Sequence, residues 1–80
     1  MDQREHERIL GNWRDERDGA ALYDALGSLE KDERLRRVFG KLADSEREHA
    51  AFWEERLRAE GRTVPQFRPC LLYTSPSPRD

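Results

Sequence analysis

Two glutamates and a histidine are the residues of this chain whose types and spacing best suit chemistry. Glu46 and His49 lie three residues apart, so a helix would place a carboxylate and an imidazole on one face, one turn apart. They interrupt an apolar pattern that steps by three or four residues, as on a bundle helix: Leu35, Phe39, Leu42, Trp53 and Leu57. Because an unpaired carboxylate in a protein interior is strongly destabilising, we expect a counter-charge near Glu46, and a divalent metal ion is the first candidate.

Glu16 interrupts a second helical pattern, which runs from about residue 3 to Leu29. The apolar members of this pattern are Ile9, Trp13, Ala20 and Tyr23, with Leu22 and Leu26 beside them. Only three polar residues centred on Lys31 separate the two patterns, which predicts an antiparallel hairpin. Glu16 and Glu46 are equally far from Lys31 along the chain, so their carboxylates should lie at the same height in the hairpin.

The expected fold is therefore all-α, an antiparallel two-helix hairpin with helices at about 3–29 and about 33–60. Asp2 and Asp32 are placed to cap the two helices, and Gly61 marks the end of the second. Residues 62–69 have the composition of an irregular connector. The register predicts three further pairs of neighbours: Tyr23 with Phe39, Trp13 with His49, and Ile9 with Trp53.

Composition limits the class of protein. The chain has 80 residues, of which 40% are charged and 35% hydrophobic, which suits thin amphipathic helices better than a thick core. The net charge of −2 comes from interspersed signs, so we expect no nucleic-acid partner. No apolar run approaches the roughly 20 residues that cross a bilayer, and the start is too charged for a secretory signal. A bacterial cytoplasmic segment without membrane contact of its own is expected.

The segment 70–80 is interpreted separately. Cys70–Asp80 matches the translation of a transposase sequencing adapter at all eleven residues in one reading frame. On this interpretation the single cysteine is not native and carries no redox information, and the natural sequence continues differently after Pro69. The alternative is a natural tail rich in proline and serine.

A larger set of residues resembles the ferritin-like, rubrerythrin-type domain, in the version found ahead of the membrane domain of vacuolar iron transporter family proteins. The resemblance covers about Trp13 to Gly61. It rests on Asn12, Trp13, Glu16, Ala21, Leu22, Tyr23, Leu26, Glu30, Leu42, Ala43, Glu46, His49, Trp53 and Leu57. It implies that residues 1–61 form the N-terminal half of a four-helix bundle enclosing two iron ions.

The resemblance also implies roles for individual residues. Glu16 would be the ligand from the first helix, Glu46 the bridging ligand and His49 a terminal nitrogen ligand, while Tyr23 would donate a hydrogen bond to a ligand carboxylate. The expected cofactor is iron, two ions in each completed site, with manganese as a second candidate. The second glutamate and its partner motif are absent from this sequence, so either a missing C-terminal helix pair or a second hairpin would complete the site.

The function that follows is iron binding for ferroxidase or iron-sensing activity, serving a membrane iron transporter in the intact protein. Two alternatives remain open: a self-assembling ferroxidase like the encapsulated ferritin-like proteins, and a non-catalytic dimerisation module. The residues also allow purely structural roles without a metal. In these, Glu46 and His49 form a solvated pair, Glu16 pairs with an arginine such as Arg47, and Tyr23 only packs in the core.

Overall fold

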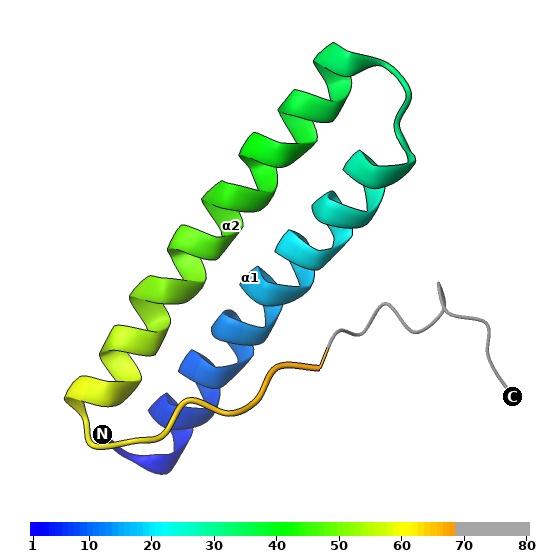
Figure 1. Cartoon of the computed structure of the whole chain (residues 1–80). Coiled ribbons are helices and arrows are strands. Elements are labelled where there is room, and N and C mark those ends of the chain that lie inside the picture. The colour runs from blue at the N-terminus through cyan, green and yellow to red at the C-terminus, as the bar shows by residue number, and fades with distance from the viewer. Residues whose placement is uncertain (69–80) are drawn as a thin grey trace, which may run out of the picture.

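Two long antiparallel helices form the molecule (Figure 1). The computed structural model describes residues 1–68, in which α1 spans Gln3–Leu29 and α2 spans Glu33–Ala59. The predicted all-α hairpin is confirmed, and the second helix ends one residue earlier than expected. Among the described residues, neither α1 nor α2 contains an apolar stretch that could span a bilayer. The adapter interpretation of 70–80, like Pro69, lies outside the described residues.

Caps fix the helix ends where the sequence predicts them. Asp2 accepts a hydrogen bond from the backbone nitrogen of Glu5 at 2.8 Å, and Asp32 accepts one from that of Arg34 at 2.8 Å. Each cap of this kind contributes about 1 kcal/mol. Beyond α2, Gly61 has a φ of 74°, a left-handed conformation that glycine adopts without a steric penalty, so it ends the helix as expected.

The contact between the helices differs from the predicted seam in the rotation of α2. The residues buried there are Ile9, Trp13, Ala20 and Gly27 of α1, and Ala43, Ala50 and Leu57 of α2. Leu35, Leu42 and His49 were expected in this seam and are exposed. Alanines need less space than leucines, so the helices pack closest when Ala43 and Ala50 face inward.

Of the three predicted pairs of neighbours, one is confirmed, one differs, and the third, Ile9 with Trp53, stays a prediction. The rings of Tyr23 and Phe39 stack with centroids 6.4 Å apart. Trp13, expected beside His49, instead donates a hydrogen bond from Nε1 to Glu54 Oε2 at 2.9 Å. The rotation of α2 accounts for this difference, because it moves His49 out of the seam.

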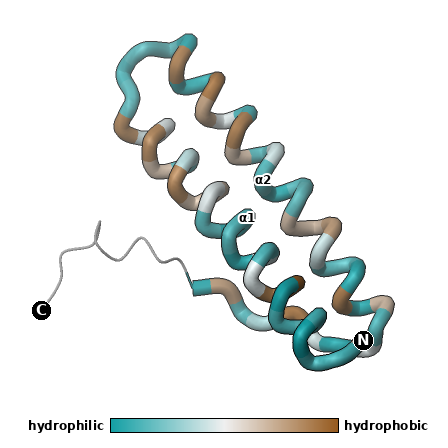
Figure 2. The backbone as a smooth tube through the Cα atoms, turned by 180° about the vertical axis from the view of Figure 1, so that it is seen from behind, coloured by the Kyte–Doolittle hydropathy of each residue, from teal (hydrophilic) through white to brown (hydrophobic). Residues whose placement is uncertain are grey.

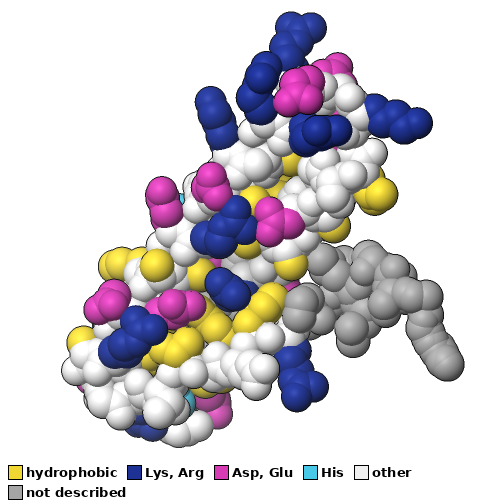
Figure 3. Space-filling model, in the orientation of Figure 1, with side chains coloured by type: hydrophobic (Ala, Val, Ile, Leu, Met, Phe, Trp, Pro, Cys, Tyr) yellow, Lys and Arg dark blue, Asp and Glu magenta, His cyan; other side chains and the backbone are white. Residues whose placement is uncertain are grey.

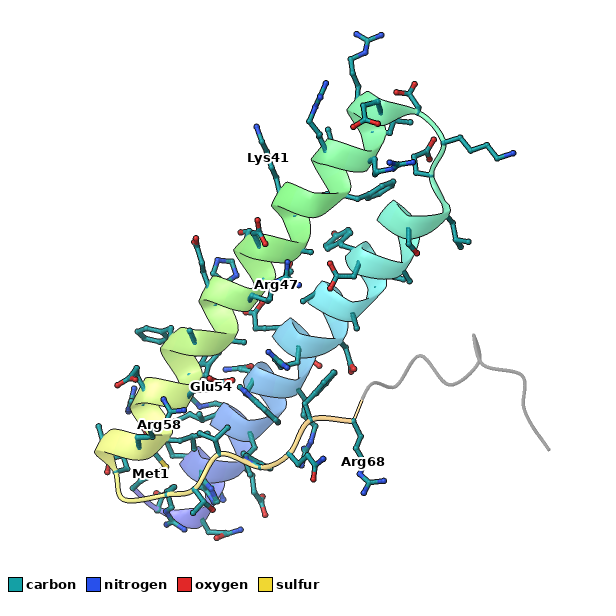
Figure 4. The ribbon with its side chains drawn as sticks, in the orientation of Figure 1. Met1, Lys41, Arg47, Glu54, Arg58 and Arg68 are labelled. Atoms are coloured by element: carbon teal, nitrogen blue, oxygen red, sulfur yellow. The ribbon has the colours of Figure 1, made fainter. Side chains whose placement is uncertain are left out.

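The connector, residues 62–68, crosses one broad side of the hairpin over the N-terminal half of α1 (Figure 1). These residues form no helix, and the Phe67 ring meets Trp13 edge-on at a centroid distance of 6.0 Å and lies 5.1 Å from Arg17. Arg47 reaches across to Asp24 at 2.8 Å, on the side of α2 that also carries Glu54 (Figure 4). Charges of both signs are mixed over this face (Figure 3).

The other broad side, the open face, has no covering segment within residues 1–68. Arg17 and Leu26 are nine residues apart, two and a half helical turns, so they point in opposite directions and Leu26 lies away from the connector. Stripes of residues spaced by three and four occupy this side of each helix. They are Gly19, Leu22 and Leu26 on α1, and Leu35, Val38, Leu42, His49 and Phe52 on α2.

The apolar side chains of the open face are between 37% and 61% exposed. Seen from behind, hydrophobic residues gather on the halves of both helices nearest the loop (Figure 2). The hairpin therefore has one side that the connector crosses and one side on which apolar side chains are exposed to solvent.

Candidate metal centre

Glu16, Glu46 and His49 come together midway along the hairpin. Each offers one ligand atom, and these atoms all lie within 4.8 Å of one another. One residue comes from α1 and two from α2, so the cluster exists only because the helices are antiparallel in the predicted register. The structure thus brings together the three residues that the sequence nominates as metal ligands.

The packing of α2 sets the direction of its two candidate ligands. Glu46 lies between Ala43 and Ala50, which are both fully buried, so its side chain turns toward α1. His49 precedes Ala50 by one residue, about 100° around the helix, and therefore lies at the edge of the open face. Glu16 reaches the same edge from α1, where it lies between buried Trp13 and Ala20.

The carboxyl group of Glu46 lies beside that of Glu16, within 4.8 Å between their ligand atoms. A hydrogen bond with Glu16, together with burial and repulsion from the Glu16 charge, raises the pKa of Glu46, and His49 opposes this shift. Two carboxylates held side by side repel each other, and either a proton or a cation relieves that repulsion.

His49 contacts the same pair, with its Nδ1 3.3 Å from Glu16 Oε1. The His49 side chain is 58% exposed and that of Glu16 25%. The expectation that a glutamate and a histidine occupy two consecutive core positions was therefore wrong, and no charged residue is fully buried among residues 1–68. The cluster opens to solvent on the open face, where a fourth ligand could approach.

A hollow of about 400 Å³ adjoins the cluster, lined by Glu16, Glu48, His49, Phe52 and Trp53. The Phe52 and Trp53 rings meet edge to face at 5.0 Å and form its apolar wall. Glu48 is not among the candidate site residues that the sequence indicates; it is exposed and lies one turn before Phe52.

Two of the structural roles without a metal can be compared with the structure. Arg47 pairs with Asp24 and Asp44, so it is not the partner of Glu16. Glu46 is half-buried beside Glu16 whereas His49 is exposed, so the reading as a solvated pair holds for His49 and not for Glu46. For Tyr23, the structure shows stacking on Phe39, and a hydrogen bond to a ligand carboxylate stays a prediction.

Comparison of the chain with protein-family models, with curated proteins and with solved structures finds no match. Its function is therefore inferred from its own residues and their geometry.

Proposed function

We propose that this chain binds divalent iron through Glu16, Glu46 and His49, as half of a ferritin-like di-iron centre. The observation that carries the proposal is the convergence of three ligand atoms from two helices within 4.8 Å. Carboxylate oxygens with one imidazole nitrogen suit Fe(II) or Mn(II), whereas a structural zinc site usually uses thiolates.

The electrostatics of the cluster fit a cation. The raised pKa of Glu46 follows from a neighbouring carboxyl group and burial, and a bound divalent ion would offset the repulsion between the two glutamates. In this arrangement Glu46 and Glu16 would hold the ion from both helices, and His49 would add a nitrogen ligand from the solvent side.

The site is proposed as a half-site because three protein ligands leave positions of an octahedral ion free. Those positions face the same side as the apolar stripes of the open face, so one partner could cover the stripes and supply the remaining ligands. A second copy of this chain or a further helix pair of the intact protein would serve. In either case the paired irons would supply electron transfer to oxygen or peroxide when bound.

In the intact protein we propose that this domain binds iron in the bacterial cytoplasm for a membrane iron transporter, with ferroxidase or sensing activity. The second candidate is a non-catalytic dimerisation module, which the exposed leucines of the open face favour independently of any metal.

Anaerobic Fe(II) titration of the full chain, with size-exclusion chromatography before and after metal, tests the proposal. We expect saturable binding that promotes self-association. Glu46→Ala should weaken binding by more than about 100-fold, since even outer partners of ligands are worth 10–100-fold, while circular dichroism shows unchanged helicity.

Glu55→Ala is the matched control, because Glu55 is an exposed glutamate of the same helix, 78% accessible, and does not line the cluster. It should bind Fe(II) like the parent chain. Unchanged binding by Glu46→Ala would refute the ligand assignment. A helical parent chain that binds no metal would leave only the dimerisation module.

A further inference from the structure

Gly19 lies against the side chain of Glu46. A Cβ atom added at Gly19 would be 3.2 Å from Glu46 Cδ, 3.3 Å from Cγ and 3.4 Å from Oε1. Glycine is unfavourable inside a helix, and the φ of Gly19 is not in the left-handed region. The backbone therefore does not require glycine at this position, and the close approach of Glu46 is the reason the structure offers.

We infer that Gly19 is a positioning residue for the proposed metal site, leaving the space in which the Glu46 carboxylate lies beside Glu16. Gly19 follows Glu16 by three residues, almost one helical turn, so both border the Glu46 side chain from α1. Glu16 and Glu46 offer ligand atoms within 4.8 Å of each other, and Gly19 provides the gap beside Glu46. This inference rests on the proposed function, because the position of the carboxylate matters most if it binds a metal.

A methyl group at Gly19 would act on the two states of the protein in opposite directions. In the metal-free chain, the atoms it meets belong to a flexible side chain, so Glu46 could move by a few tenths of an ångström and alanine would bring its better helix propensity. In the metal-bound chain, ligand distances tolerate only about 0.2 Å. The same displacement should therefore lower metal affinity.

Gly11 provides a matched control within the same helix. It too is an internal glycine of α1, and a Cβ atom there would meet nothing within 4 Å. Gly19→Ala and Gly11→Ala thus make the same chemical change, and only the first places a methyl group against a proposed ligand.

The experiment compares the parent chain with both variants by thermal unfolding without metal and by anaerobic Fe(II) titration. Both variants should unfold at temperatures a few degrees higher, up to about 4–8 °C for a chain of this size. Gly11→Ala should keep the parent affinity, and Gly19→Ala should bind Fe(II) at least about 10-fold more weakly.

Parent affinity in Gly19→Ala would overturn the inference while leaving the proposed function standing. A lower unfolding temperature for metal-free Gly19→Ala would overturn it as well, because it would assign Gly19 to helix packing. If the parent chain binds no Fe(II), the proposed function fails first and this inference falls with it.

Discussion

The three candidate ligands differ in solvent exposure, so we expect them to contribute differently to stability and to metal binding. Glu46 lies between two fully buried alanines and has a raised pKa, so its charge is the one that the metal-free fold tolerates least. His49 is mostly exposed and can turn without disturbing the helices. The identity of Glu46 should therefore control both stability and metal binding, and that of His49 mainly metal binding.

The raised pKa of Glu46 predicts a pH dependence that Glu46→Gln removes. Above 4.5, the ordinary pKa of a glutamate, the folded chain holds the Glu46 proton more tightly than the unfolded chain, so stability falls as pH rises through the raised pKa. Relative to Glu46→Gln, the metal-free parent should lose stability between pH 4.5 and neutral pH, and thermal unfolding of both chains across this range would measure the gap.

Glu55→Gln is the control for this titration, because it removes an exposed carboxylate away from the cluster. It should leave the pH profile of the parent nearly unchanged. A gap between the parent and Glu46→Gln that stays constant from pH 4.5 to 7 would show that Glu46 titrates alike in the folded and unfolded chains.

At the level of the elements, the sequence was sufficient for the helices and insufficient for the rotation of α2. Cap residues and the polar break around Lys31 predicted the bounds to within one residue. The apolar pattern could not decide whether Leu42 or its neighbour Ala43 faces α1, because both fit a helical stripe. A pattern ranks residues by hydrophobicity, whereas two helices alone pack closest on their smallest residues.

The height of the site was predictable, since it depends on the distance of Glu16 and Glu46 from the loop. The exposure of His49 was not, because it depends on the rotation of α2. The close approach at Gly19 was also indicated by the sequence, since a glycine inside a helical pattern costs stability and usually has a packing or functional reason.

The buried alanine seam predicts that Ala50→Leu destabilises the hairpin. Ala50 is fully buried, so a larger side chain must force the helices apart, at a cost of about 1–3 kcal/mol. Urea unfolding would measure the change as a lower midpoint with little change in slope. Ala51→Leu is the adjacent control at an exposed position and should stay within about 0.5 kcal/mol of the parent; equal effects at both positions would place the seam elsewhere.

For the whole molecule, the asymmetry between its two sides is the main consequence of the fold. Phe67 of the connector packs on Trp13 and Arg17, so part of the side opposite the candidate ligands is already occupied by the connector. The open face combines exposed leucines with the ligand cluster. One partner could therefore bury the exposed leucines and supply the remaining metal ligands.

If that partner is a second copy, Leu42→Glu should weaken metal-promoted dimerisation by at least about 10-fold, because a charge in an apolar contact is costly unless it is paired. Sedimentation of the metal-loaded chain would measure the dimer. Ala51→Glu adds the same charge to an exposed position of α2 outside the open-face stripe and should leave dimerisation intact. A dimer indifferent to Leu42→Glu would mean that the copies meet through another surface.

The buried seam has one more geometric consequence. Trp13, Ala20 and Gly27 repeat every seven residues, and so do Ala43, Ala50 and Leu57. An α-helix has 3.6 residues per turn, so a heptad seam stays in contact only if the helices wind around each other in a left-handed supercoil, crossing at about 20°. Helices that cover the open face would have to follow the same twist, which favours a long, nearly parallel bundle over a perpendicular crossing.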